Sequence, residues 1–371
     1  FVNRHGRQRM TGEALAEGVN ENDGPVRPFV VTKGKATGKT FGFFIKDARG
    51  DRYLFKFDTP EYPEMTTGAE VVSSKFLHAI GYYVPQYTIC RFTESDLEVA
   101  EGAKFYDTDG FRKYLTEERT LELLRQLTYI APGGVYRASA SKFLAGDILG
   151  PCLFSGPARK GDPRDLVPHD RRRGIRALRV FSSWINHTDI SDRNSLAVGV
   201  TEDGEYRVRH YLIDFGSSLG SGARRPAPAE DGHEYWFDTD QIRRRLTALG
   251  FYLPPWREDY EVLYPSVGNF SSRLFDPGKW KQILPQFAFE SLTDRDAFWA
   301  AKIVMCFSDD DIRAIVRTGE YSDPAPEQYL VRMLIERRDK LGKYWFSRVN
   351  PIDNFELAVD ESGNYVLSFE D

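Results

Sequence analysis

The sequence predicts a two-lobed α+β fold, in which a small strand-rich N-lobe precedes a larger, mostly helical C-lobe. Strand-like runs separated by turn residues dominate the first part of the chain. A loop rich in Gly and Pro follows over residues 150–169, and the end of the chain has strong helical periodicity. We therefore expect an N-terminal arm over residues 1–28, an N-lobe over 29–149 and a C-lobe over 150–371.

The composition limits the classes of protein to which the chain can belong. The chain has 371 residues, of which 41% are hydrophobic, as in folded globular proteins. Its net charge of -5 does not favour a general nucleic-acid binder, and no apolar run is long enough to span a membrane. The three cysteines are too widely spaced for a disulfide framework or a zinc site, so packed thiols are expected. The first residue is Phe1 rather than Met, and the compartment cannot be read from this sequence.

The N-lobe begins with a glycine-bearing hairpin. The run from Gly34 to Thr40 is similar to a P-loop, but three residues rather than four separate Gly34 from Gly38. An aromatic run without helical period, residues 41–45, comes next, and a turn leads to a second strand-like run over 53–57. This order predicts two strands joined as a hairpin and excludes a P-loop.

The remaining elements follow from periodicity and end signals. In the N-lobe we expect a helix from Met65 or Thr66 to Ile80, ended by Gly81, and further elements at 85–89 (strand), 117–126 (helix) and 135–143 (strand). In the C-lobe we expect elements at 171–184 (helix), 186–194 (polar loop), 195–200 (strand), 206–214 (strand), 294–307, 309–318 and 326–345 (helices). Residues 216–284 are too rich in Gly, Pro and aromatic residues to assign.

The polar loop has the residue types that phosphoryl transfer requires. Asp189 and Asn194 stand in an Asp-x-x-x-x-Asn pattern, and His187 precedes the aspartate by two residues. Downstream, an apolar strand ends at Asp214, which is followed by Phe215 and Gly216. In phosphoryl transfer one carboxylate orients the attacking hydroxyl, while an asparagine and a second carboxylate hold Mg²⁺ on the phosphates.

The same chemistry needs a cation that neutralises phosphate charge and a partner that orients it. Lys56, on the strand after the glycine hairpin, and Glu70, in the first turns of the next helix, have the residue types and the order for this pair. Lys35 and Lys39 could add positive charge at the hairpin, although exposed hairpin lysines are the commoner case.

With these motifs in place, the chain resembles the protein-kinase-like superfamily over Val30 to Trp345. It is most similar to the atypical branch of HipA-like kinases, spore-coat CotH-type kinases and phosphatidylinositol kinases. Residues 54–85, 184–198 and 210–222 resemble bacterial proteins of that branch.

The resemblance implies a role for each motif residue. Lys56 would hold the α- and β-phosphates of ATP, oriented by Glu70, and Asp189 would act as the catalytic base. Asn194 and Asp214 would bind Mg²⁺, with Mn²⁺ as the alternative metal. The hairpin glycines Gly34, Gly38 and Gly42 would cover the nucleotide phosphates, although their spacing departs from that of protein kinases and leaves the contacting amides open.

Other departures bear on regulation and substrate. Thr188 stands where protein kinases have the arginine of the His-Arg-Asp motif, so control by a phosphorylated activation loop is not expected. No Ala-Pro-Glu motif follows Gly216, which puts a peptide-substrate platform in doubt. Asp192 is a further candidate for metal or substrate binding. The sequence thus predicts an ATP- and Mg²⁺-dependent phosphotransferase with an unknown protein, lipid or small-molecule acceptor. AMP transfer and a pseudokinase that only binds nucleotide are the alternatives.

Overall fold

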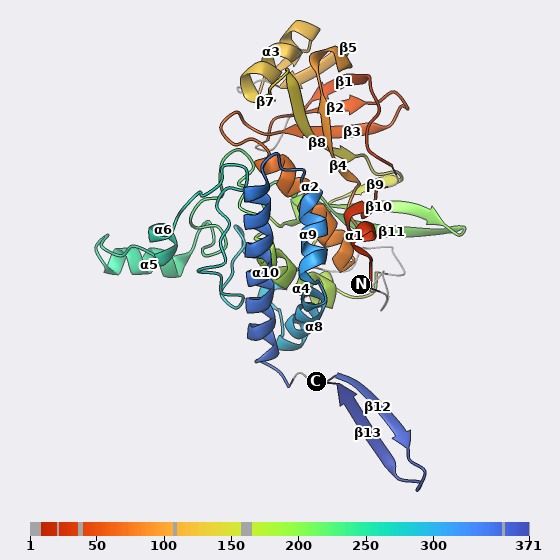
Figure 1. Ribbon diagram of the computed structural model, residues 1–371, viewed down its shortest axis with the longest axis vertical. Coiled ribbons are helices and arrows are strands. Elements are labelled where there is room, and N and C mark those ends of the chain that lie inside the picture. The colour runs from red at the N-terminus through yellow and green to blue at the C-terminus, as the bar shows by residue number, and fades with distance from the viewer. Residues whose placement is uncertain are drawn as a thin grey trace.

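The computed structural model describes residues 9–20, 22–35, 40–106, 110–156, 165–350 and 353–370. Figure 1 shows a strand-rich lobe above a larger helical lobe. The predicted bilobal α+β class, with a small β-rich N-lobe and a larger, mostly helical C-lobe, is confirmed by the order and pairing of these elements.

The N-lobe is built on one eight-stranded sheet with the order β4-β8-β3-β2-β1-β5-β6, and β7 pairs with β8. Its strands are β1 (Phe29–Gly34), β2 (Gly42–Lys46), β3 (Arg52–Phe57), β4 (Tyr87–Phe92), β5 (Leu97–Tyr106), β6 (Arg112–Tyr114), β7 (Ile130–Ala131) and β8 (Val135–Lys142). The short helix η1 (Glu94–Asp96) and helix α3 (Glu117–Leu127) complete the lobe. Aromatic side chains such as Phe43, Phe55 and Tyr136 fill its core.

The C-lobe gathers around helices α4 (Arg173–Trp184), α8 (Asp294–Met305), α9 (Asp309–Arg317) and α10 (Pro324–Phe346). A three-stranded sheet of β9 (Asp147–Gly150), β10 (Ser195–Glu202) and β11 (Glu205–Leu212) lies beside them. Smaller elements are α5 (Thr239–Thr247), α6 (Pro255–Glu258), α7 (Phe287–Glu290), η2 (His169–Arg171) and η3 (Asp192–Asn194). A hairpin of β12 (Asp353–Val359) and β13 (Tyr365–Glu370) extends away from the lobe (Figure 1).

Helix α2 (Met65–Ile80) connects the two lobes. It is buried along almost its whole length, and Val72, Phe76 and Leu77 belong to the same hydrophobic cluster as α4, α8 and α10. Asp58, at the end of β3, satisfies its first turn: the carboxylate accepts from Thr66 N at 2.8 Å, Thr67 N at 2.9 Å and the Thr67 hydroxyl at 2.6 Å. An aspartate outside the helix thus provides the acceptors that N-terminal amides require.

Several expectations are corrected in detail. The predicted N-terminal arm contains a helix, α1 (Gly12–Glu17), which is capped by Thr11 and buries Leu15 in the C-lobe core. Helix α4 begins at Arg173 rather than residue 171, since residues 169–171 form a 3₁₀ turn. Helix α10 begins at Pro324 because Asp323 caps it. Cys90 and Cys152 are buried thiols as expected, whereas Cys306, at the end of α8, is exposed.

The Asp58 contacts predict a large effect of Asp58→Ala. The variant leaves the buried amides of Thr66 and Thr67 without acceptors, so the free energy of unfolding should fall by about 2–4 kcal/mol. Urea denaturation followed by circular dichroism measures this difference. Asp51→Ala is the control, because Asp51 pairs with Lys142 at the surface and its loss should cost about 1 kcal/mol or less. Equal losses for the two variants would contradict the capping role of Asp58.

Candidate functional site

Lys56 lies at the centre of the candidate site. Its ammonium forms an ion pair with Glu70 and a second one with Asp214, 2.8 Å from the Asp214 Oδ1 atom. Strand β3 carries the lysine, helix α2 carries Glu70, and Asp214 follows β11, so three separate elements meet at one ammonium group. The structure therefore brings together three of the residues that the sequence marked as candidates.

The two carboxylates differ in accessibility. The Glu70 side chain is 0% exposed, whereas that of Asp214 is 41% exposed. Burial raises the pKa of Glu70 more than Lys56 lowers it. Burial also disfavours the Asp214 anion, but Lys56, with help from Lys35, outweighs it and lowers the pKa of Asp214 to about 2. Asp214 is thus the ionised, reachable carboxylate, and Glu70 is the inward partner that orients the lysine.

The backbone after β11 is shaped around Glu70. Asp214 has a φ of 61°, in the left-handed region that aspartate tolerates better than most residues. Phe215 N donates to Glu70 Oε2 at 3.0 Å. A Cβ atom on Gly216 would lie 3.0 Å from Glu70 Oε1 and 3.2 Å from a Thr66 methyl group, so glycine fits best there. Glu70 therefore positions both the lysine and the Asp-Phe-Gly segment.

The loop of residues 186–194 is held by its own hydrogen bonds. Asn194 Nδ2 donates to the Asp189 carbonyl at 2.6 Å, and Ile213 N donates to the Asn194 carbonyl at 3.0 Å, which ties the loop to the strand that ends at Asp214. Asp192, a further candidate for metal or substrate binding, has a structural role, since its carboxylate accepts from Phe154 N at 2.7 Å. The amide oxygen of Asn194 is the part of that side chain left for another ligand.

His187 connects the loop to the Asp-Phe-Gly segment. Its ring packs edge-on against Phe215 at 5.8 Å between centroids, and Nδ1 lies 3.2 Å from the Ser217 carbonyl. Burial lowers the pKa of His187, while the Ser217 carbonyl and the nearby Asp189 and Asp214 carboxylates oppose that shift. Both carboxylates are therefore close enough to this buried ring to affect its charge.

The hairpin glycines have packing explanations. A Cβ atom on Gly34 would overlap the Phe105 side chain, and one on Gly42 would overlap the Phe55 carbonyl of the adjoining strand. These close approaches require glycine whether or not a nucleotide binds. Gly38 and Lys39 lie outside the described residues. The phosphate-covering role of the three glycines stays a prediction.

Two residues near the site carried little or no signal in the sequence. Lys35 is not simply an exposed hairpin lysine: its Nζ donates to the Thr40 carbonyl at 3.1 Å, and burial, then the Lys56 charge, lower its pKa. Tyr87, on β4, is buried and its hydroxyl accepts from Asp214 N at 3.3 Å. Tyr87 stands in an ordinary strand pattern, and only the folded chain reveals its contact with Asp214.

The donor set fits a magnesium ion that shares its ligands with phosphates. The Asn194 amide oxygen and the Asp214 carboxylate are hard oxygen donors, which Mg²⁺ prefers. Within the described part of the chain, no three His, Cys, Asp or Glu residues cluster as a complete metal cage. Mg²⁺ in nucleotide sites takes one or two protein ligands and completes its shell with phosphates and water, so two donors are sufficient.

Comparison with known proteins gives distant structural similarity only. No family model and no curated protein matches the chain. Among solved structures, a Helicobacter pylori proinflammatory kinase, CtkA, superposes with a TM-score of 0.43 and 13% identity, covering 85% of this chain and 95% of that one. The Golgi casein kinase superposes with a TM-score of 0.37 and 10% identity, covering 91% and 77%. Both of these proteins are kinases.

None of the helices in the described ranges combines the length and the apolar character that a membrane crossing requires.

The shared lysine makes the site sensitive to charge removal. Lys56→Met leaves the buried Glu70 carboxylate without its cation, so the free energy of unfolding should fall by about 3–5 kcal/mol near neutral pH. The pKa of Glu70 rises further in this variant, so the folded state binds a proton more readily. The loss should therefore shrink as the pH is lowered from about 8 to about 5.

Denaturant unfolding of four chains measures this coupling. The double variant Lys56→Met/Glu70→Leu should recover most of the stability, because no buried charge is left unpaired. Lys142→Met is the control, as it removes a partly exposed pair with Asp51. A double variant no more stable than Lys56→Met, or a loss that does not depend on pH, would contradict the pairing.

Proposed function

We propose that the chain is an ATP-dependent phosphotransferase that moves the γ-phosphoryl group to a hydroxyl acceptor. The observation that carries this proposal is the Lys56 ammonium held between Glu70 and Asp214. A buried lysine with one inward carboxylate and one solvent-reachable carboxylate can present positive charge to phosphates beside a metal-binding oxygen.

Each residue then has a separate task. Lys56 neutralises phosphate charge, and Glu70 fixes its orientation. Asn194 and Asp214 would hold Mg²⁺, which supplies charge neutralisation on the phosphates when bound. Asp189 orients the acceptor hydroxyl and accepts its proton as the acceptor oxygen bonds to the γ-phosphorus. The bond from phosphorus to the bridging oxygen breaks, and ADP leaves with that electron pair.

We further propose that the chain belongs with the HipA-like, CotH-like and phosphatidylinositol-kinase-like group and with its bacterial members, on the motif residues given above. We divide it into an arm over 1–28, an N-lobe over 29–149 and a C-lobe over 150–371. The pairing of β9, at Asp147–Gly150, with the C-lobe strand β10 supports a boundary close to residue 149. AMP transfer and a pseudokinase remain the rival functions that the two experiments below separate.

Mg²⁺–ATP should raise the melting temperature of the chain, because a ligand that binds only the native state stabilises it by mass action. The shift should shrink when the metal is chelated, since Asp214 would face the phosphates without the ion. Thermal denaturation with ATP, with and without Mg²⁺ and chelator, measures it. No shift at millimolar Mg²⁺–ATP would exclude a nucleotide site.

Substitutions of Asp189 and Asp214 should have different effects on turnover and on ATP affinity. Asp189→Asn should lower turnover about a hundredfold or more, the usual scale for a positioned acid–base group, and leave Mg²⁺–ATP affinity nearly unchanged. Asp214→Asn keeps the left-handed backbone accessible but should lose the metal-dependent part of ATP affinity. Calorimetry and ATP labelled at the γ- or α-phosphate measure affinity, turnover and the group transferred.

Asp203→Asn, on the exposed β10–β11 turn, is the control for both variants, because it also changes an aspartate at positive φ. Transfer of the α-label would identify an AMP transferase. Binding without transfer of either label would identify a pseudokinase. Loss of ATP binding in Asp189→Asn with normal binding in Asp214→Asn would reverse the two assignments.

A further inference from the structure

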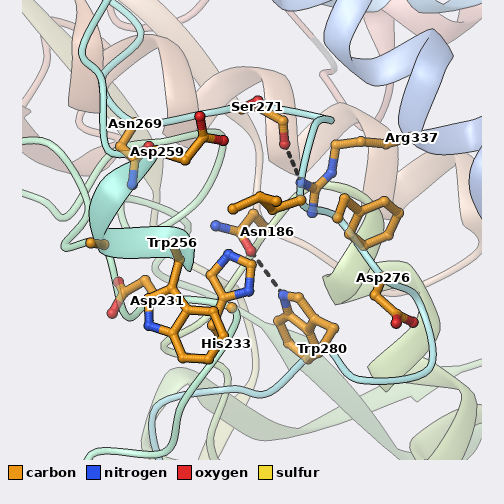
Figure 2. A pocket seen from close by; sticks show the side chains of 14 residues that line it. Asn186, Asp231, His233, Trp256, Asp259, Asn269, Ser271, Asp276, Trp280 and Arg337 are labelled. Atoms are coloured by element: carbon orange, nitrogen blue, oxygen red, sulfur yellow. Dashed lines mark hydrogen bonds between the residues drawn. The ribbon is translucent and has the colours of Figure 1, made fainter. Parts of the chain in front are cut away.

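A pocket lies in the C-lobe beside Asn186, the first residue of the loop 186–194 (Figure 2). It has a volume of about 50 Å³, and the residues that line it include Asn186, Asp231, His233, Trp256, Asp259 and Arg337. Lys56, Glu70 and Asp214 do not line it. The pocket is therefore separate from the ion-paired lysine, although it shares the loop that carries Asp189.

Two hydrogen bonds join the pocket wall to that loop. Trp280 Nε1 donates to Asn186 Oδ1 at 2.8 Å, and the Thr188 hydroxyl donates to Asp231 Oδ2 at 3.1 Å. Asn186 and Thr188 stand three residues and one residue before Asp189. A molecule held in the pocket is thus next to the segment that presents the predicted base.

Asn186 has a donor that the protein does not use. The residue is only 9% exposed, and its Nδ2 atom makes no hydrogen bond with any described residue. Figure 2 shows its oxygen turned to Trp280 and its nitrogen turned the other way, among the lining side chains. Because Nδ2 is not among the buried unpartnered atoms of the described residues, it is open to the pocket, where an acceptor atom of a ligand could replace water.

The opposite side of the pocket supplies acceptors and a ring surface. Asp231, Asp259 and Asp276 bring carboxylates to the lining. Asp259 pairs with Arg273 and Asp276 with Lys279, whereas Asp231 accepts from the Thr188 hydroxyl. His233 and Trp256 are stacked in parallel, 5.0 Å between centroids and 3° between planes. Burial, then the Arg337 charge, lower the pKa of His233 to about 4, so this ring is uncharged near neutral pH. A ligand must therefore donate as well as accept.

Arg337 does not make the pocket an anion site. Its guanidinium donates to the Ser183 and Trp184 carbonyls, at the negative C-terminal end of α4, and to the Ser271 carbonyl. Its remaining face stacks on Phe275 at 3.8 Å. The protein itself compensates this charge, and the lining also holds three aspartates, so among the lining residues an anion finds no uncompensated cation.

We propose that the pocket binds a hydroxyl group of a sugar or polyol and that this polyol is the phosphoryl acceptor. A hydroxyl group can accept from Asn186 and donate to Asp231 at once, which a simple ammonium or a carboxylate cannot do. The pocket holds a few water-sized groups, since one water needs about 10–15 Å³. It therefore takes one edge of a sugar and leaves another hydroxyl to reach Asp189. The acceptor assignment rests on the function proposed above.

Binding is tested without nucleotide, which separates the pocket from the phosphotransferase function. Saturation-transfer NMR on the full chain uses glucose, ribose and myo-inositol as probes, with acetate and ethylamine as the anionic and cationic comparators. We expect saturation transfer to at least one polyol and none to acetate or ethylamine. If no polyol binds at millimolar concentration while Mg²⁺–ATP still raises the melting temperature, the pocket proposal is overturned and the proposed function stands.

Asn186→Asp is the decisive variant. It preserves side-chain size, the left-handed backbone (φ 49°) and the acceptor for Trp280, but it replaces the donor with an oxygen and adds charge near Asp231. Polyol affinity should fall at least about tenfold, or about 1.4 kcal/mol. Asn350→Asp, at an exposed position, is the matched control and should bind as the native chain does.

The melting temperature of Asn186→Asp, with and without Mg²⁺–ATP, shows whether the variant is folded. Unchanged polyol affinity in a folded Asn186→Asp chain would place the ligand elsewhere and overturn the proposal. Transfer of the γ-label to the bound polyol is expected in the native chain. Polyol binding that depends on Asn186, together with label transfer to a different molecule or to none, would overturn its assignment as the acceptor.

Discussion

The Lys56 ammonium is the group on which the arrangement of the site depends. It is buried, and an unpaired buried cation would be too costly to retain, so both Glu70 and Asp214 must approach it. That requirement fixes the rotation of α2 relative to β3 and brings the chain back to the sheet after β11. Electrostatics thereby determine the position of an element from each lobe.

The residues around this ion pair serve it indirectly. Asp58 anchors the start of α2, which sets where Glu70 lies. Glu70 also accepts from the Phe215 amide, and the lack of a side chain on Gly216 lets the backbone approach the carboxylate. His187 then packs on Phe215 and connects the segment to the loop that holds Asp189 and Asn194. One chain of contacts therefore runs from the N-terminus of α2 to the loop.

The sequence predicted much of this because local pattern and local chemistry agree for those elements. The apolar periods of α2, α4 and α10 and the polar loop of residues 186–194 can each be recognised from the local sequence alone. The parallel pairing of β1 with β5 could not be predicted in this way, because it depends on contacts between segments that are distant in the sequence. Residues 216–284 were unassignable for a similar reason: α5, α6 and the pocket side chains His233 and Trp256 are held mainly by tertiary contacts.

Residue function was harder to predict than residue position. The hairpin glycines were interpreted through a ligand, yet Gly34 and Gly42 are explained by strand packing alone. Tyr87 and Asn186 gave no sequence signal, since a strand tyrosine and a loop asparagine are ordinary in such places. Their importance appears only from their hydrogen bonds in the folded chain. The Tyr87 hydroxyl accepts from the Asp214 amide, and Asn186 has a side-chain donor without a partner among the described residues.

The contacts of α2 also limit how the two lobes can move. Arg137, on β8, donates to the Thr67 hydroxyl and to the carbonyls of Gly319 and Glu320 beyond α9, and Glu64 accepts from Ser322 N. A rigid-body rotation of the N-lobe would break these buried bonds together. The orientation of the two lobes is thus fixed on the β8 side of the sheet, and a movement of the β1–β2 hairpin, which β3 separates from β8 in the strand order, would leave these bonds intact.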